Sequence, residues 1–178
     1  MSDALPALVT EAEFLALPAS MTQTELLDGE VIVSPAPTFR HQDVLRRLVV
    51  ALSAWADAAD DVHVVGQAPV DIRFGPGRIL QPDAFVIRGS VDLDREGPLD
   101  QVPMLCIEVL SRDRLYDRVT KRLVYATAGV EEYWTVDPAG AIERWTGDGL
   151  ARRDVLTDVV VSPRLPGFSL NIGSLFPR

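Results

Sequence analysis

The sequence is poor in several residue types on which common functional sites depend. It has one cysteine, Cys106, which excludes an intramolecular disulfide, and with only two histidines a structural zinc site is not expected. Cys106 lies inside an apolar run, so we interpret it as a small core residue and not as a nucleophile. The sequence also has no Gly-x-Ser-x-Gly motif and no glycine-rich phosphate loop, which argues against the enzyme classes built on them.

Long hydrophobic runs and a basic leader are absent as well. No apolar run approaches the ~20 residues of a membrane span, and the start, Met-Ser-Asp-Ala-Leu-Pro, has no basic region followed by an apolar one. We therefore expect a cytoplasmic protein without a membrane partner. A length of 178 residues, of which 47% are apolar, predicts a single domain, 1–178, with a sizeable core.

The charge balance is acidic, with a net charge of −9. This argues against non-specific attraction to nucleic acid, because phosphate binding depends on Lys and Arg side chains that displace counterions. A nucleic-acid-binding protein of this composition would need a local basic surface, and a solvated helix face is the alternative interpretation of each basic cluster. The candidates are Arg40, Arg46, Arg47, Arg112, Arg114, Arg118, Lys121 and Arg122.

Lysine is almost missing. Of the 17 Lys and Arg residues, only Lys121 is a lysine. Lys carries a compact, rotatable point charge and Arg a planar fork, so the two are not chemically equivalent. The single lysine favours a specific role at this position, although chance remains the alternative.

A carboxylate interrupts the apolar run 104–110, which has the pattern of a strand buried on both faces. Burying Glu108 there costs several kcal/mol unless it is paired, hydrogen-bonded or bound to a metal. A second apolar run, 79–87, contains Asp83. If the two runs are neighbouring strands about 4.8 Å apart, both carboxylates reach one Mg²⁺ ion, which takes one or two carboxylates and keeps waters. By the two-residue period, Gln81 shares a face with Asp83 and is expected to line the site.

A helix is predicted from about Asp113 to Ala128, with Gly129 as its C-terminal cap. It carries two stripes. Leu115, Val119, Leu123 and Ala126 form the apolar one, and Asp117, Lys121 and Tyr125 form the polar one. An ion pair between Asp117 and Lys121, worth a few tenths of a kcal/mol, is the structural alternative to a catalytic lysine.

Other local signals predict the rest of the fold. Thr10 and Glu13 form a capping-box pattern before a short helix, and Asp28-Gly29 predicts a hairpin between strands 24–27 and 30–33. Thr38 can cap a helix that runs to about residue 59. His41 lies in the first turn of this helix, where it is either a solvated neighbour of the cap, the interpretation that we favour, or a contact to a substrate phosphate. Strands are expected at 62–65, 68–74, 132–136 and in short segments beyond 142, and residues 89–103 as an exposed loop.

These residues resemble the Uma-type family of restriction endonucleases in the PD-(D/E)XK nuclease superfamily. The resemblance rests on Pro82-Asp83, on the segment 107–111 around Glu108, on the polar helix stripe and on the segment 128–138, and it runs from about Thr10 to Phe176. The superfamily places a lysine two residues after its second acid, where this chain has Leu110. In the Uma-type family the lysine is thought to have moved to the following helix, which implies Lys121 here.

The resemblance implies an α/β (α+β) fold, in which helices flank a restriction-endonuclease-like mixed β-sheet and an N-terminal helix and β-hairpin precede it. It implies an endonuclease dependent on Mg²⁺ or Mn²⁺, with nucleic acid, first of all DNA, as substrate. Asp83 and Glu108 would hold the metal, Lys121 would assist the attacking water, and Glu25 would approach the metal. Gln81 or Tyr125 would position the water, and a homodimer would suit an enzyme that cuts both strands.

Each assignment has a structural alternative. Asp83 could be a strand-start aspartate and Glu25 an exposed strand residue. Taken together, these alternatives describe a non-catalytic interaction protein on a nuclease-like scaffold, an interpretation supported by the acidic net charge and by Leu110. It predicts that Asp83, Glu108 and Lys121 form an internal salt-bridge cluster that binds no metal.

Overall fold

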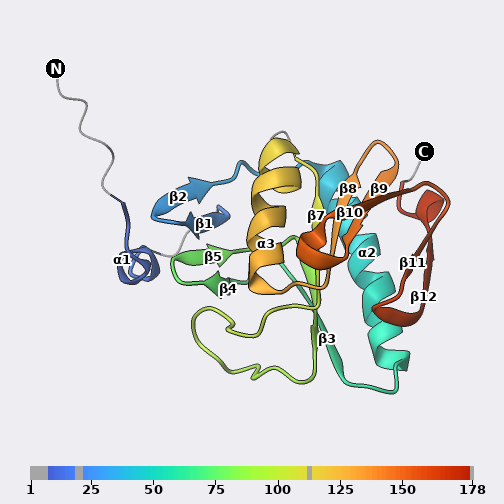
Figure 1. Cartoon of the computed structure of the whole chain (residues 1–178), viewed down its shortest axis with the longest axis horizontal. Coiled ribbons are helices and arrows are strands. Elements are labelled where there is room, and N and C mark those ends of the chain that lie inside the picture. Colours follow the sequence, from blue (N-terminus) through green and yellow to red (C-terminus); the bar gives the residue numbers. More distant parts are fainter. Residues whose placement is uncertain (1–7, 19–21, 112–113, 177–178) are drawn as a thin grey trace.

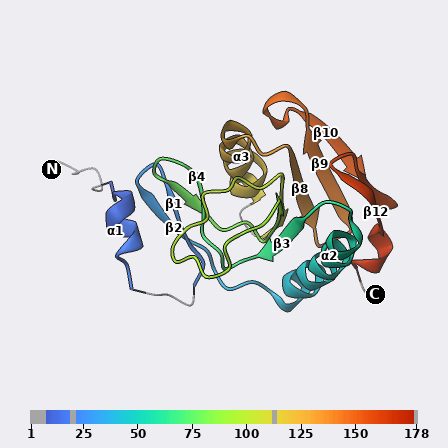
Figure 2. The same cartoon turned by 90° about the horizontal axis from the view of Figure 1, so that it is seen from below.

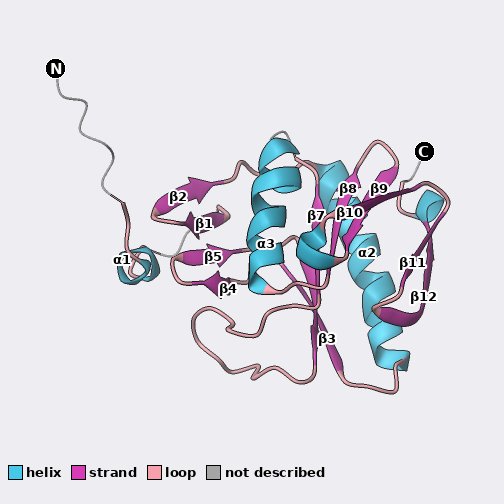
Figure 3. Cartoon of the chain, in the orientation of Figure 1, coloured by secondary structure: helices cyan, strands magenta, loops and turns pink. Residues whose placement is uncertain are grey.

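A computed structural model of the protein describes residues 8–18, 22–111 and 114–176 (Figure 1). Figure 3 shows how helices and strands alternate along it. The helical segments are α1 (Glu11–Leu15), α2 (Phe39–Ala58), η1 (Tyr116–Lys121), α3 (Arg122–Ala128), η2 (Asp148–Leu150) and η3 (Ile172–Ser174). The strands are β1 (Thr24–Leu27), β2 (Glu30–Val33), β3 (His63–Gln67), β4 (Ile72–Gly75), β5 (Arg78–Leu80), β6 (Ala84–Arg88), β7 (Leu105–Val109), β8 (Glu132–Asp137), β9 (Ala141–Thr146), β10 (Arg152–Leu156), β11 (Val159–Ser162) and β12 (Leu165–Asn171).

The strands form three sheets. The largest has six strands in the order β10-β9-β8-β7-β6-β3, in which β7 and β8 are parallel and all other neighbours antiparallel. A four-stranded antiparallel sheet has the order β2-β1-β5-β4, and β11 pairs with β12. The large sheet is mixed and flanked by helices, which confirms the predicted fold class.

Two helices cover opposite faces of the six-stranded sheet (Figure 2). Strand β7 shows the division, because successive side chains of a strand point to opposite faces. Leu105, Ile107 and Val109 pack in the cluster that contains α2, whereas Cys106 packs in the cluster that contains α3. Glu108 shares the face of Cys106, so it points toward the helical segment that carries Lys121.

Several local predictions are confirmed. The Thr10 side chain accepts a hydrogen bond from the amide of Glu13, and the Glu13 carboxylate accepts one from the amide of Thr10, so the capping box is complete. Thr38 caps α2, where its side chain accepts from the amide of His41 at 3.2 Å. Gly129 ends α3 with a φ of 93°, a conformation for which glycine pays no steric cost.

The prediction of one strand over residues 79–87 is wrong. The chain pairs as β5 in the small sheet, leaves it at Gln81, and enters the large sheet as β6 after Asp83. Pro82 at this point lacks an amide hydrogen and cannot continue a ladder of hydrogen bonds. The expected strand 68–74 shortens to β4. Because the run 79–87 is divided into β5 and β6, five strands separate α2 from the next helical segment.

The helix predicted from Asp113 to Ala128 differs in two respects; Asp113 itself lies outside the described residues. Its first part, η1, is a π-helix. Its stripes are also reversed in burial: Leu115, Val119 and Leu123 are 75%, 44% and 52% exposed, whereas the polar side chains of the other stripe are buried. The polar stripe faces inward because its partners are carboxylates of neighbouring strands.

The segment between β6 and β7 is a long, largely exposed loop, as predicted. One isolated bridge, between Ile72 and Leu99, fastens it to β4. Across residues 8–18, 22–111 and 114–176, no helix combines the length and the apolar character that crossing a membrane requires.

Candidate active site

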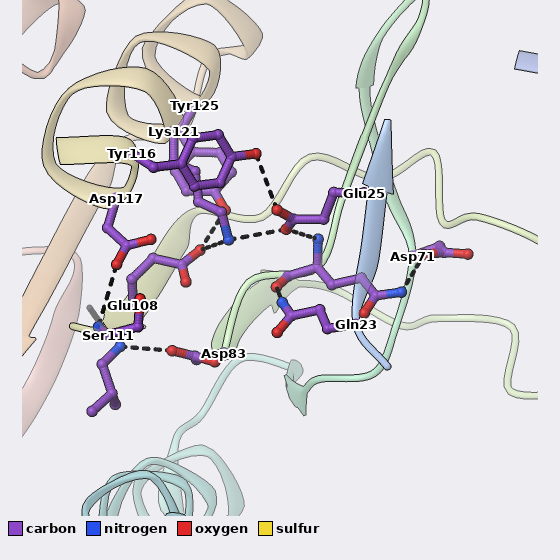
Figure 4. A network of polar contacts seen from close by, with 12 residues as sticks. Gln23, Glu25, Asp71, Asp83, Glu108, Ser111, Tyr116, Asp117, Lys121 and Tyr125 are labelled. Atoms are coloured by element: carbon purple, nitrogen blue, oxygen red, sulfur yellow. Dashed lines mark hydrogen bonds and ion pairs between the residues drawn. The ribbon is translucent and has the colours of Figure 1, made fainter. Parts of the chain in front are cut away.

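Lys121 occupies the centre of a buried polar network (Figure 4). Its Nζ lies 2.9 Å from Glu25 Oε1 and 3.0 Å from Glu108 Oε1. These three residues come from η1, β1 and β7, and each is at most 3% exposed. An ammonium between two carboxylates offsets part of the cost of burying all three charges. Lys121 pairs with these two glutamates, and not with Asp117 as the structural alternative required.

Two tyrosines hold the glutamates from the helical side. Tyr116 donates its hydroxyl to Glu25 Oε2 at 3.1 Å, and Tyr125 donates to Glu108 Oε1 at 2.7 Å (Figure 4). Tyr125 is fully buried, and burial first, then the neighbouring Glu108, raises its hydroxyl pKa well above the usual value. Both hydroxyls are therefore hydrogen-bond donors to carboxylates, a role that sequence reasoning missed for Tyr116.

Asp83 directly precedes β6 and lies at the same site. The register pairs Ala84 with Ile107 in antiparallel strands, which sets Asp83 opposite Glu108, so the prediction that the two runs are neighbours is confirmed. Asp83 Oδ2 accepts a hydrogen bond from the amide of Val109 at 2.8 Å. The amide fixes the carboxylate at the edge of the sheet beside Glu108.

His41 contacts the other oxygen of Asp83, with 3.3 Å between Nε2 and Oδ1. It is 8% exposed, so the favoured interpretation of a solvated cap neighbour is wrong. The N-cap residue Thr38 accepts a hydrogen bond from the amide of His41, which fixes the first turn of α2 with its imidazole at Asp83. His41 therefore restrains Asp83 from the face opposite the lysine-bearing helix.

Gln81 takes part through its main chain. Its amide donates to Glu25 Oε1 at 2.8 Å and its carbonyl accepts from Gln23 at 2.6 Å, whereas its side chain donates to Asp71 at 2.7 Å (Figure 4). The side chain does not line the cavity described below. The break in the expected strand at Pro82 is the reason, because it ends the alternation on which the predicted position depended.

Asp117 is a fourth carboxylate at the site, which sequence reasoning placed on the polar stripe without giving it a role there. Its Oδ2 accepts only a long hydrogen bond, 3.5 Å, from the amide of Ser111. Burial raises its pKa to about 6, against the opposing effects of Lys121 and of the Ser111 amide. The signal was present in the sequence as the spacing of Asp117, Lys121 and Tyr125 along one stripe.

A cavity of about 540 Å³ opens onto these groups. Its polar wall contains Asp83, Glu108, Asp117, Lys121 and His41. The opposite wall is formed mainly by the segment 34–37, by Ala68 and Pro69, and by Leu45 of α2. The described chain thus brings Asp83, Glu108 and Lys121 to one cavity, whereas the predicted residues Glu25 and Tyr125 lie behind them and do not line it.

The electrostatics of the cluster are dominated by its carboxylates. Burial raises the pKa of Glu108 well above its usual value, and Asp83, Asp117 and Glu25 add to this while Lys121 opposes it. Burial alone would lower the pKa of Lys121, but the same four carboxylates together outweigh it and raise that pKa well above the usual range. Lys121 therefore stays protonated, and the excess of acidic groups around it favours the binding of a further cation.

The donor set fits a magnesium ion better than a zinc ion. Within the described ranges, no three His, Cys, Asp or Glu side chains gather as a set of metal ligands, which a structural zinc would need. Asp83 and Glu108 supply two carboxylates, and both hydrogen bonds to Glu108 fall on Oε1. Mg²⁺ binds through one or two carboxylates and retains waters, for which the cavity has space.

The basic surface expected on the two helices does not form. Arg46 and Arg47 pair with Asp43, and Arg114 and Arg118 pair with acids of β8 and β9. Arg122 donates to main-chain carbonyls and lies over the ring of Trp145, and Arg112 lies outside the described residues. Ion pairs within α2 neutralise Arg46 and Arg47, and ion pairs across the fold neutralise Arg114 and Arg118.

The fold is a mixed α+β one, in which helices flank a six-stranded sheet and a buried acidic cluster lies at one end of its central strands. A similar fold occurs in the crystal structure titled "putative nuclease belonging to DUF820" from Anabaena variabilis ATCC 29413, with a TM-score of 0.76 at 23% identity over 94% of this chain and 97% of that chain. Residues 11–173 match the Uma2 family, described as "Putative restriction endonuclease", and the chain belongs to this family. No curated protein matches it.

Proposed function

We propose that this protein is a metal-dependent endonuclease that hydrolyses phosphodiester bonds in nucleic acid, first of all DNA. The observation that carries the proposal is the meeting of Asp83, Glu108 and Lys121 at one cavity. The position two residues after Glu108 is Leu110, yet an ammonium still lies 3.0 Å from Glu108, supplied by the following helix. The family to which the chain belongs supports a nucleic-acid substrate.

In this proposal Asp83 and Glu108 would hold Mg²⁺ or Mn²⁺, which when bound polarises the scissile phosphate and lowers the pKa of a bound water. Lys121 directs its charge at the cavity, where it orients the water or stabilises the negative charge that builds up on phosphorus. Glu25 holds that ammonium in position, and the amide of Gln81 donates to Glu25 and fixes its carboxylate. His41 and the amide of Val109 do the same for Asp83.

The proposal is tested by calorimetric titration of Mn²⁺ into the wild type and into Asp83→Ala, with Asp94→Ala as an acid-matched control in the exposed loop. We expect binding in the wild type and in the control and none in Asp83→Ala. Cleavage of labelled DNA in Mg²⁺ should follow the same pattern and should be lost in Lys121→Ala. A wild type and an Asp83→Ala variant that are both folded and both fail to bind Mn²⁺ would contradict the metal assignment.

A specific observation also favours a second function, a non-catalytic interaction protein on the same scaffold. Lys121 pairs with Glu108, as this alternative predicts, although its second partner is Glu25 and not Asp83. The same titration distinguishes the two functions. If the protein is a non-catalytic interaction protein, Asp83→Ala changes the stability, and neither the wild type nor any variant binds Mn²⁺. A homodimer that cuts both strands stays a prediction, and sedimentation velocity at several concentrations tests it.

A further inference from the structure

A large aromatic side chain stands exposed beside the acidic cavity. Phe39, the first residue of α2, is 89% exposed. Single exposed apolar residues are common on protein surfaces, so exposure alone indicates no function. Phe39, however, lines a groove of about 350 Å³ that shares Gln42 and Leu45 with the cavity containing Asp83. The groove and the cavity therefore adjoin each other at α2.

The next residue of α2 after Phe39 is a free cation. Arg40 is exposed, and among the arginines in the part of the chain that the structure describes it alone has neither an ion pair nor a hydrogen bond. Arg46, farther along the groove, is paired with Asp43. The first turn of α2 thus presents one exposed aromatic ring, which lines the groove, and one uncompensated positive charge.

This combination is complementary to an unpaired nucleotide. A base stacks on an aromatic ring whatever its sequence, and the adjoining phosphate needs a cation within reach. In a duplex the faces of the bases are covered by their neighbours, so a ring such as Phe39 has a partner only where a base is unpaired. Tracking a duplex backbone would require many free Lys and Arg side chains, and those of the described chain are engaged in ion pairs.

We propose that Phe39 and Arg40 form a subsite for an unpaired nucleotide, and that the substrate is a single-stranded segment which enters the acidic cavity along α2. The inference rests on the proposed function for the direction of the strand, because the groove adjoins the cavity where phosphodiester hydrolysis is proposed. The subsite itself is a matter of binding and does not depend on catalysis.

The test measures binding without cleavage. Fluorescence anisotropy in EDTA follows a labelled single-stranded DNA of mixed sequence, and the same strand in a duplex, titrated with wild type, Phe39→Ala, Phe39→Trp and Arg40→Gln. Leu93→Ala is the matched control, because Leu93 is 88% exposed but belongs to the distant loop. We expect the wild type to prefer the single strand and Phe39→Ala to lose about 10-fold in affinity. Phe39→Trp should retain affinity, and Arg40→Gln should reduce the salt slope by about one.

Several results would overturn the inference: no binding of the single strand by the wild type, equal affinity in Phe39→Ala, or an equal loss in Leu93→Ala. A change of oligomeric state in Phe39→Ala, seen by sedimentation, would assign the ring to a contact with a second copy instead. Cleavage in Mg²⁺ separates the two proposals. If Phe39→Ala loses binding and the wild type does not cleave, the subsite is retained and the nuclease is rejected. If the wild type cleaves and Phe39→Ala binds as well as the wild type, the nuclease is retained and the subsite is rejected.

Discussion

At the scale of single residues, the charge of Lys121 is the one on which the buried carboxylates depend most. It is the one cation between Glu25 and Glu108, both of which are buried. We expect Lys121→Met to lower the free energy of unfolding by about 3–5 kcal/mol, because two carboxylates then remain buried without compensation. Urea denaturation at neutral pH measures this.

Lys121→Arg is the informative companion variant. A guanidinium keeps the charge but needs room for a planar fork, and this side chain is only 2% exposed. We expect a loss of stability smaller than that of the Met variant. Equal stability of wild type and Lys121→Met would show that the glutamates take up protons without cost, contrary to the ion-pair interpretation.

Asp117 makes stability depend on pH. Its pKa is about 6 in the fold against 3.8 for an unperturbed aspartate, so between these values the folded state binds more protons than the unfolded state. The contribution of Asp117 is therefore present at low pH and is lost as pH rises through about 6, by up to about 3 kcal/mol. The difference in unfolding free energy between wild type and Asp117→Asn should fall by that amount from pH 4 to pH 7 in EDTA. Parallel pH profiles would contradict it.

Residues differ in how far the sequence reveals them. Asp83 and Glu108 could be paired because a buried strand makes an acid conspicuous and strand spacing supplies its neighbour. Glu25 was implied by the family resemblance alone, since its partner Lys121 is far away in the chain. Nothing local distinguishes Asp117 from a solvated helix residue until the carboxylates of other strands are placed opposite it.

At the scale of elements, the π-helix η1 determines which side chains face the site. A turn closed from residue i to i+5 contains one residue more than an α-helical turn, and such segments are frequent at functional sites. It brings Tyr116 toward Glu25 while Lys121 lies between the glutamates. Deleting Thr120 should restore α-helical bonding and turn Tyr116 away.

We expect the deletion to cost about 1.5–3 kcal/mol through the lost hydrogen bond to a buried carboxylate. A double-mutant cycle with Tyr116→Phe checks the cause. If the π-turn serves to place this hydroxyl, the deletion should cost less in the Tyr116→Phe background. Strictly additive effects in urea denaturation would mean that the wider turn acts on something else.

Elements whose signals are local were predicted, and those that depend on distant pairing were not. A capping box, an Asp-Gly turn and a helix-ending glycine each act within a few residues, so α1, the β1–β2 hairpin and the end of α3 followed from the sequence. The transfer of the chain at Pro82 from one sheet to the other depends on β1, more than fifty residues earlier. The π-helix has no sequence pattern that we could recognise.

At the scale of the whole molecule, the distribution of charge matters more than its sum. A net charge of −9 predicts weak attraction to nucleic acid, and the fold reinforces this by pairing arginines with acids. The sequence did not reveal the partners of Arg114 and Arg118, which lie on other strands, whereas Asp43, the partner of Arg46 and Arg47, lies within one turn of the same helix. Among the described residues, what remains for a substrate is local: one free arginine, one exposed ring and an acidic cavity.

The position of Lys121 in the chain also has a consequence for folding during synthesis. Glu25 belongs to the small sheet, Glu108 to the large one, and the lysine to the helical segment after both. A chain on the ribosome that has not yet reached residue 121 carries two acids without their cation, and a chain whose sheets have not docked cannot close the cluster. The active site of the proposed nuclease would thus be assembled only when the fold is complete, and until then the nascent chain could not cleave the messenger RNA that encodes it.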